Sequence, residues 1–130
     1  MKESDLQIKV ADYLRYKYPH VLFHSDFGSG IKMTKGQAVK QYRQNGGRRG
    51  WPDMFIAQPV GIDGKTICGC FIELKKEGTR IYKKDGSPAT PHIAEQLKVL
   101  EELGQRGYYC YIVAGFDQAK EVIDDYLEHF

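Results

Sequence analysis

The stretch FIELK at residues 71–75 is the part of the sequence that decides the fold. Side chains alternate between the two faces of a β-strand, so Phe71, Glu73 and Lys75 point to one face and the two aliphatic residues to the other. The apolar residues indicate a buried strand, in which Glu and Lys are rare unless they are paired or bind a ligand. An acid and a base are therefore expected side by side on one face of a buried strand.

Asp53, in the dipeptide Pro52-Asp53, lies upstream on a second predicted strand. Two carboxylates that converge offer the oxygen ligands of a hard cation such as Mg²⁺, which neutralises charge on a phosphate and lowers the pKa of a bound water. Lys75 would then orient that water or stabilise the phosphorane as it forms. The ordinary alternative is that Glu73 and Lys75 are two solvated side chains, because the triplet ELK is common by chance. The upstream Pro-Asp strand favours the catalytic interpretation.

The length of 130 residues suits one domain, residues 1–130, with a single hydrophobic core. The three cysteines lie in apolar runs, and their odd number argues against a disulfide-stapled secreted domain. Cys68 and Cys70 lack the second pair that a zinc site needs, so we expect buried thiols. With no signal peptide and no apolar run long enough to cross a bilayer, the expected compartment is the cytoplasm, that of the host if the gene is carried by a phage.

The formal net charge is only +2, but it is unevenly distributed. Residues 27–52 contain six Lys and Arg and no acid, whereas residues 117–130 contain five acids and one Lys. This asymmetry suggests one surface that faces a polyanion, with a solvated basic loop as the alternative. Arginine forks bind phosphate in a bidentate manner. The candidate nucleic-acid contacts are Lys32, Lys35, Arg48, Arg49, Lys76 and Arg80.

Apolar periodicity and turn residues predict a mixed order of helices and strands. Gly28 and Gly30 mark a loop, Asp63-Gly64 marks a hairpin turn, and Thr34 and Thr90 are expected helix N-caps. The predicted elements are a helix at 3–18, a strand at 21–24, a polar surface helix ending at Gln44, paired strands at 53–58 and 66–75, a helix ending at Gly104 or Gly107, an apolar strand at 108–114 inside the sheet, and an acidic helix opened by Asp117. This order predicts an α/β fold with a small mixed sheet flanked by helices.

The order of the motifs resembles the VRR-NUC branch of the PD-(D/E)XK nuclease superfamily, small stand-alone versions of which occur in phages. The resemblance spans nearly the whole chain and implies a restriction-endonuclease-like fold with metal-dependent phosphodiester hydrolysis. It rests on Glu3 in the first helix, Gly50-x-Pro52-Asp53, Glu73-Leu74-Lys75, Gln96 in the next long helix, and Gly107-Tyr108 before a strand.

The resemblance implies a role for each matching residue and Mg²⁺ or Mn²⁺ as the cofactor. Gln7 lies one turn after Glu3 and is an alternative to it. Trp51 either stacks on a base or packs at the core or its rim. Asp53 and Glu73 correspond to the metal-binding acids, with Leu74 included in the metal site, Lys75 to the catalytic lysine, Glu3 to the helix-one acid, and Gln96 to the glutamine that braces the site.

Stand-alone relatives are associated with homodimers and with cutting branched DNA such as four-way (Holliday) junctions. The resemblance therefore implies a structure-selective DNA endonuclease acting as a homodimer. The alternatives are a non-catalytic nucleic-acid-binding or assembly module and a nuclease directed to flaps or ends. Retention of both acids and the lysine favours an enzyme. Candidates for an apolar dimer interface are Tyr13, Tyr16, Tyr18 and Tyr82.

Overall fold

A four-stranded mixed sheet forms the centre of the computed structural model, which describes residues 1–26 and 32–130. Gly28 and Gly30, expected to mark a loop, lie outside the described residues. The strand order is β1-β2-β5-β6, and β3 and β4 form a separate hairpin. The elements are α1 (Glu3–Lys17), β1 (Phe23–Ser25), α2 (Lys35–Gln44), β2 (Met54–Ile56), β3 (Val60–Ile62), β4 (Lys65–Ile67), β5 (Cys70–Lys75), α3 (Pro91–Gly104), β6 (Tyr109–Ala114) and α4 (Phe116–Leu127).

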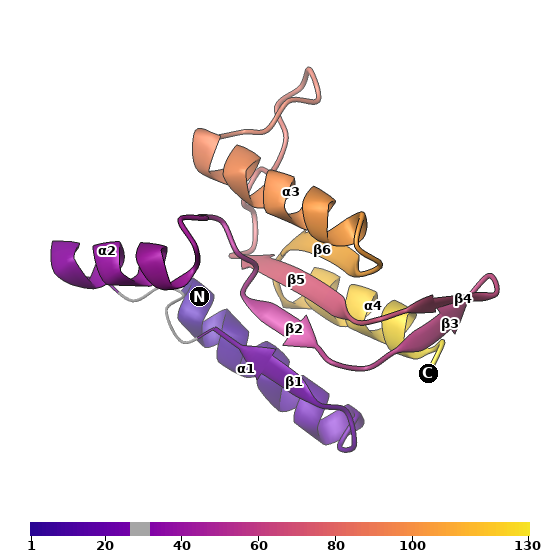
Figure 1. Cartoon of the computed structure of the whole chain (residues 1–130). Helices are drawn as coiled ribbons and strands as arrows, with labels where there is room; N and C mark the ends of the chain where they lie inside the picture. Colours follow the sequence, from indigo (N-terminus) through magenta and orange to yellow (C-terminus); the bar gives the residue numbers. More distant parts are fainter. Residues whose placement is uncertain (27–31) are drawn as a thin grey trace.

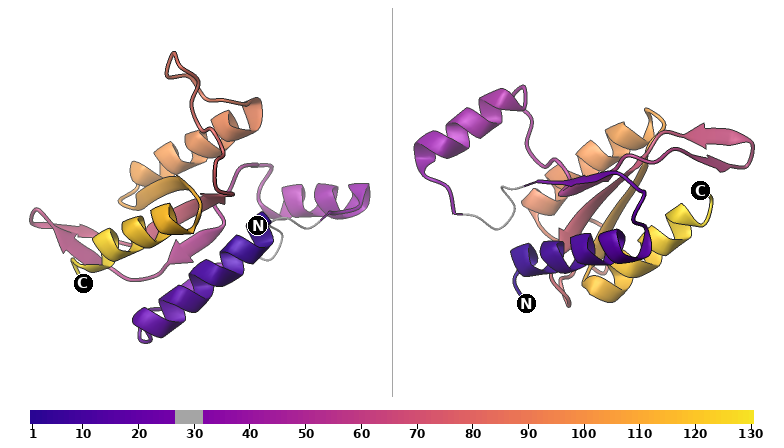
Figure 2. Two further views of the ribbon diagram at one scale, coloured as in Figure 1. Left: turned by 180° about the vertical axis from the view of Figure 1, so that it is seen from behind. Right: turned by 90° about the horizontal axis from the view of Figure 1, so that it is seen from below.

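Helices cover both faces of the sheet, which confirms the predicted α/β class. α1 and α4 pack on one face and α3 packs on the other (Figures 1 and 2). The main core lies beneath α1 and α4, where Leu14, Ile72 and Ile123 are completely buried. On the α3 face, Phe71 stacks on Phe55 with ring centroids 4.4 Å apart. The alternation expected along FIELK is therefore present, because neighbouring residues of β5 face different layers.

α2 projects away from the sheet (Figures 1 and 2) and contributes no buried residue. Its N-terminus has the expected cap, since the Thr34 hydroxyl accepts a hydrogen bond from the Gln37 N–H. The Gln37 side chain accepts the Thr34 N–H in return, completing a capping box. The capping box at its N-terminus thus stabilises α2, which buries no side chain, as expected for a polar surface helix.

The strand predicted at residues 66–75 is interrupted. β4 ends at Ile67 and β5 begins at Cys70, and the Asp63-Gly64 turn closes the β3–β4 hairpin only. At Gly69 a Cβ atom would come within 2.6 Å of the Phe55 ring, so the chain passes too close to β2 for a side chain. Cys68, expected to be buried, is exposed, whereas Cys70 is buried.

β6 lies at the edge of the sheet, so the prediction of an interior strand was wrong. The strand runs parallel to β5, with Cys70 opposite Tyr109 and Lys75 opposite Ala114. α3 and α4 cover its two faces, and this coverage explains its apolar sequence without a second neighbouring strand. Within residues 1–26 and 32–130, every helix is too short or too polar to cross a membrane.

Candidate active site

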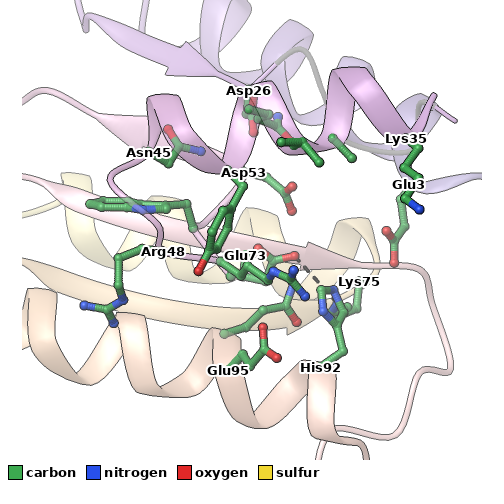
Figure 3. A pocket seen from close by; sticks show the side chains of 18 residues that line it. Glu3, Asp26, Lys35, Asn45, Arg48, Asp53, Glu73, Lys75, His92 and Glu95 are labelled. Atoms are coloured by element: carbon green, nitrogen blue, oxygen red, sulfur yellow. Dashed lines mark ion pairs between the residues drawn. The ribbon is translucent and has the colours of Figure 1, made fainter. Parts of the chain in front are cut away.

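A cleft of about 790 Å³ opens between α2 and α3, where β2 begins and β5 ends. One side of α2 and residues 48–51 form one wall, and the first turns of α3 form the other. Asp53, Glu73 and Lys75 lie at its base and Glu3 of α1 lies at its edge (Figure 3). Residues distant in sequence therefore meet in a single cleft.

Strand pairing brings the two acids together. β2 runs antiparallel to β5 with Met54 opposite Ile72, so Asp53 arrives beside Glu73 one position further along the ladder. Asp53 Oδ2 accepts the Leu74 N–H at 2.8 Å, which fixes the carboxylate against β5. Lys75 Nζ lies 3.7 Å from Glu73 Oε2. All three side chains are less than a tenth exposed although each carries an ionisable group, and Figure 3 shows them converging.

Burial is the largest cause that raises the pKa of Glu73 well above its usual range. The charge of Asp53 and a hydrogen bond to its side chain raise this pKa further, whereas Lys75 opposes the shift. Glu3 adds a smaller repulsion from the edge of the cleft. One lysine does not balance this concentration of negative charge, so a further cation would be stabilised here.

The chemistry of the acids fits a divalent metal ion. Glu73 Oε1 is buried and has no hydrogen-bond partner among the residues described. An unpartnered carboxylate oxygen beside a second carboxylate supplies the hard oxygen donors that Mg²⁺ and Mn²⁺ take. Within residues 1–26 and 32–130, no group of three or more His, Cys, Asp or Glu is arranged to hold a metal. Protein ligands would therefore be few and water would complete the coordination, as is usual for Mg²⁺.

Leu74 faces away from the cleft. Its side chain is almost completely buried in the core under α1 and α4, and its N–H is used by Asp53. Only its main-chain carbonyl oxygen remains as a metal ligand, because the side chain has no donor atom. The expected contribution of Leu74 is thus restricted to the backbone.

Gln96 is buried on α3 and reaches the same cleft. Its Oε1 atom has no hydrogen-bond partner in the described part of the chain, like that of Glu73. Gly50 packs directly against this turn of α3 and has a φ of 81°. A Cβ atom at this position would lie only 3.0 Å from the Gln96 backbone nitrogen. Glycine is required at this position, and it lets the segment before Asp53 press against α3.

The two candidates on α1 have different positions. Glu3, the first helical residue, lines the cleft. Gln7 is buried and donates its amide to the Asp26 carbonyl oxygen at 2.8 Å. The Asp26 N–H in turn donates to the Asp53 carbonyl oxygen at 2.7 Å. Gln7 therefore supports the backbone next to Asp53, and Glu3 is the α1 residue whose side chain lines the cleft.

The basic candidates divide into two groups. Lys35, Arg48 and Arg49 line the cleft, whereas Lys32, Lys76 and Arg80 are exposed outside its lining. Arg48 forms an ion pair with Glu102 of α3, and Figure 3 shows its side chain directed away from the acids. The Arg49 guanidinium lies 5.0 Å from the centroid of the Tyr42 ring, which holds it at the cleft wall.

Several cleft residues were missed by sequence reasoning. His92 and Glu95 come from the first turns of α3, and Asp26 and Tyr42 line the cleft from the segments before and within α2. His92 precedes Gln96 by one helical turn, so the helical period could have placed it on the same face. No sequence pattern indicates that α2 lies beside the site, because the position of this helix depends on the tertiary structure.

A solved structure described as a "VRR_NUC domain protein" has the same fold, with a TM-score of 0.68 over 100% of this chain and 91% of that chain. The two sequences are 22% identical. At this sequence identity the structural similarity establishes the fold. This fold is the one implied by the order of motifs in the sequence. The sequence matches no protein-family model and no curated protein.

Proposed function

We propose that this chain is a metal-dependent DNA endonuclease that hydrolyses phosphodiester bonds in the cleft between α2 and α3. One observation carries the proposal: a buried pair of acids, Asp53 and Glu73, meets Lys75 at the base of a cleft with basic residues on its wall. Buried carboxylates that repel each other destabilise a fold, so their presence together points to a function. The VRR_NUC name of the structural neighbour agrees with a nuclease.

Asp53 and Glu73 would hold Mg²⁺ or Mn²⁺, with the Leu74 carbonyl oxygen as an additional donor. The ion would supply a Lewis acid that neutralises phosphate charge and lowers the pKa of a bound water. Lys75, in the same buried site, would orient the attacking water or donate to the phosphate oxygens as negative charge develops. Gln96 would brace the site, and Glu3 would complete its acidic edge.

Basic residues on both sides of the acids suit the DNA backbone. Lys35 and Arg49 lie on the α2 side, while Lys76 and Arg80 belong to the segment that leads from β5 to α3. That segment projects beyond α3 (Figure 1), and its tip is ordered by the Lys83 N–H, which donates to the Ser87 carbonyl oxygen at 2.8 Å. Contacts to phosphate dominate the affinity of proteins for DNA, and two basic arms around one site would supply them.

We further propose that a homodimer of this single domain cuts branched DNA, with four-way junctions as the expected substrate. The cysteines within residues 1–26 and 32–130 are free thiols, which suits the reducing cytoplasm. Two alternatives remain. A non-catalytic nucleic-acid-binding module would have no need of the buried acids, and a flap- or end-directed nuclease would use the same acids without a partner subunit.

Cleavage of matched DNA substrates tests the proposal. Four-way junctions, flaps, duplexes and single strands of the same sequence would be incubated with Mg²⁺, Mn²⁺ or EDTA. We expect cleavage with either metal ion, none with EDTA, and preference for the junction. Binding without cleavage under all metal conditions would identify the non-catalytic module, and equal cutting of flaps by a monomer would identify the flap nuclease.

A further inference from the structure

Trp51 is an exposed aromatic residue in the wall of the cleft. It is the only tryptophan of the chain, and 43% of its surface is accessible. In the described part of the chain, its indole takes part in no ring stacking and no cation–π contact. Tyr42, by contrast, forms a cation–π contact with Arg49. Tryptophan is highly buried on average, so a partly exposed indole in the wall of a cleft is a candidate binding surface. The indole is therefore free to receive a flat ligand.

The backbone holds Trp51 in a fixed place relative to the acids. Gly50 on one side presses against α3, where a Cβ would lie only 3.0 Å from the helix backbone and the φ of 81° would strain any other residue. Pro52 on the other side is buried and restricts its own φ angle. Asp53 follows directly and is tied to β5 by the Leu74 N–H. The indole thus belongs to a rigid segment only two residues from a metal-binding carboxylate.

The surroundings of Trp51 combine apolar surface with charge. Ala38, Val39 and Tyr42 present apolar surface to the cleft from α2, whereas Lys35 and Arg49 present positive charge to the same space. A ligand that is anionic along one edge and flat and apolar elsewhere satisfies both. A nucleotide has this character, with its phosphate drawn to the cations and its base suited to an aromatic face.

We propose that Trp51 stacks on an unpaired nucleobase next to the phosphate that is cut. This inference rests on the proposed nuclease function and adds the feature of the DNA that the site recognises. In a duplex both faces of each base are covered by its neighbours and only the edges are open, so an aromatic side chain reaches a base face only where stacking is broken. The preferred DNA then contains an unpaired or unstacked nucleotide at the scissile phosphate, as at a branch point or in a single strand.

The fluorescence of the single tryptophan tests this stacking directly. The Glu73→Gln variant, kept in EDTA so that no cleavage occurs, would be titrated with a single strand, an abasic strand of equal length, and a duplex. We expect saturable quenching with the single strand and little with the abasic strand, which has the same phosphates without bases. Equal quenching by the abasic strand, or none by the single strand, overturns the inference.

Substitution of Trp51 provides a second, independent measurement. Stacking of one base is worth roughly 1–3 kcal/mol, so Trp51→Ala should weaken binding of single-stranded and branched DNA by about tenfold or more and leave duplex binding unchanged. Trp51→Phe should retain most of the affinity. Phe130→Ala removes an aromatic residue that is 66% exposed after α4, outside the cleft lining, and serves as the control. An equal loss on duplex DNA would overturn the inference.

The two proposals fail in different ways. Wild-type protein that cuts DNA with Mg²⁺ or Mn²⁺ but gives no base-dependent quenching keeps the nuclease function and overturns the role of Trp51. Protein that shows quenching by single strands but cuts none of the substrates supports the stacking surface and overturns the nuclease function.

Discussion

Asp53 receives its orientation from the main chain of a neighbouring strand. The Leu74 N–H donates to one carboxylate oxygen, so the second oxygen remains available toward Glu73 and the cleft. Glu73 has one oxygen near Lys75 and one without a partner in the described residues. Each acid therefore has one oxygen that is held and one that is open, an arrangement that suits two acids sharing a ligand.

Substitution of the three central residues should abolish cleavage while the fold is retained. Asp53→Asn, Glu73→Gln and Lys75→Ala each remove a charge from the site, and loss of one preorganised electrostatic group costs on the order of 10²-fold or more in rate. Single-turnover cleavage of a junction measures the effect. Activity within tenfold of wild type in any variant would contradict the role of that residue.

Metal binding has a readout that does not depend on cleavage. Repulsion between Asp53 and Glu73 destabilises the protein, so Glu73→Gln should raise the melting temperature without metal. A ligand that binds only the folded state stabilises it by mass action. Mg²⁺ or Mn²⁺ should therefore raise the melting temperature of the wild type and have a much smaller effect on Glu73→Gln. An equal metal effect in both proteins would place the ion elsewhere.

The acid and the lysine of the site could be predicted from the sequence because charged residues are unusual in an apolar strand. Glu73 and Lys75 alternate with aliphatic residues in a strand, and such charged residues need partners. Tyr42 could not be assigned in this way, because tyrosine is an ordinary residue on a helix, and the only sequence signal for His92 is its spacing of one helical turn from Gln96. Their place in the cleft depends on how α2 and α3 are positioned by the rest of the chain.

At the scale of elements, an ion pair links the segment before β2 to α3. Arg48 pairs with Glu102, while its neighbour Arg49 lies on Tyr42 of α2. Arg49→Ala should therefore weaken DNA binding and reduce the log–log salt slope by about one unit, the value for one phosphate contact. Binding isotherms at several salt concentrations measure this slope. An unchanged slope would show that Arg49 contacts no phosphate.

Glu102 provides a matched test for Arg48. Glu102→Ala removes the partner and frees Arg48, so DNA binding should become stronger and the salt slope should increase. Arg48→Ala should have the opposite effect. If both substitutions weaken binding equally, the ion pair acts as a structural link and Arg48 is not a DNA contact.

A hydrogen-bond network joins α1 to α4 on the opposite face of the sheet. The hydroxyls of Tyr13 and Tyr18 donate to Asp124 Oδ1 at 2.6 and 2.7 Å. Lys17 Nζ lies 3.2 Å from the same oxygen. Burial alone would raise the pKa of Asp124, but these three partners outweigh it and hold this pKa below its usual value. The charged form of Asp124 therefore stabilises the contact between the two helices.

Asp124→Asn should lower stability by about 1 kcal/mol at neutral pH, since hydrogen bonds to charged groups are strong but this network is partly exposed. The folded pKa lies below the unfolded value, so the contribution of Asp124 is present above about pH 4 and is lost as the pH falls through the folded pKa. Urea unfolding at several pH values measures the difference. Asp125→Asn removes the same charge from an exposed position and is the control; an equal loss in both variants would contradict the network.

The elements themselves were predictable where local signals fix them. Thr34 and Thr90 cap α2 and α3 as expected, because capping is a contact between neighbours in sequence. The break at Gly69 and the edge position of β6 were not predictable. Gly69 is required because the Phe55 ring lies close to it. A strand whose two faces are covered by helices has the same apolar sequence at the edge of a sheet as in its interior.

Over the whole molecule, the basic side chains near the site gather on one wall of the cleft. Basic residues on α2 and residues 48–49 line the cleft, whereas the acidic helix α4 packs on the face opposite α3. The cleft also holds acids, namely Glu3, Asp26, Asp53, Glu73 and Glu95, so a polyanion would be attracted at the basic wall and would approach the acids only when a cation offsets their charge. In the proposed function, DNA would approach with its phosphate backbone toward this basic wall.

Symmetric incision of a four-way junction needs two sites, so we predict a homodimer with two-fold symmetry. Tyr13 and Tyr18 are engaged with Asp124, which leaves Tyr16 and Tyr82 as the exposed candidates among the tyrosines considered. Analytical ultracentrifugation at micromolar concentration should give a dimer. Tyr16→Lys and Tyr82→Lys, made separately, would identify the pairing surface. A monomer that still nicks DNA would contradict the dimer and favour the flap- or end-directed activity.

The hydrogen bond from Leu74 to Asp53 also couples the chemistry of the site to completion of folding. The two acids meet only when β2 and β5 pair in the correct register, and a slip of one residue turns alternate side chains to the opposite face. A nascent or misfolded chain then carries two separated carboxylates, which could not share the proposed metal ion. A nuclease of the proposed kind would gain its activity only when its sheet has formed.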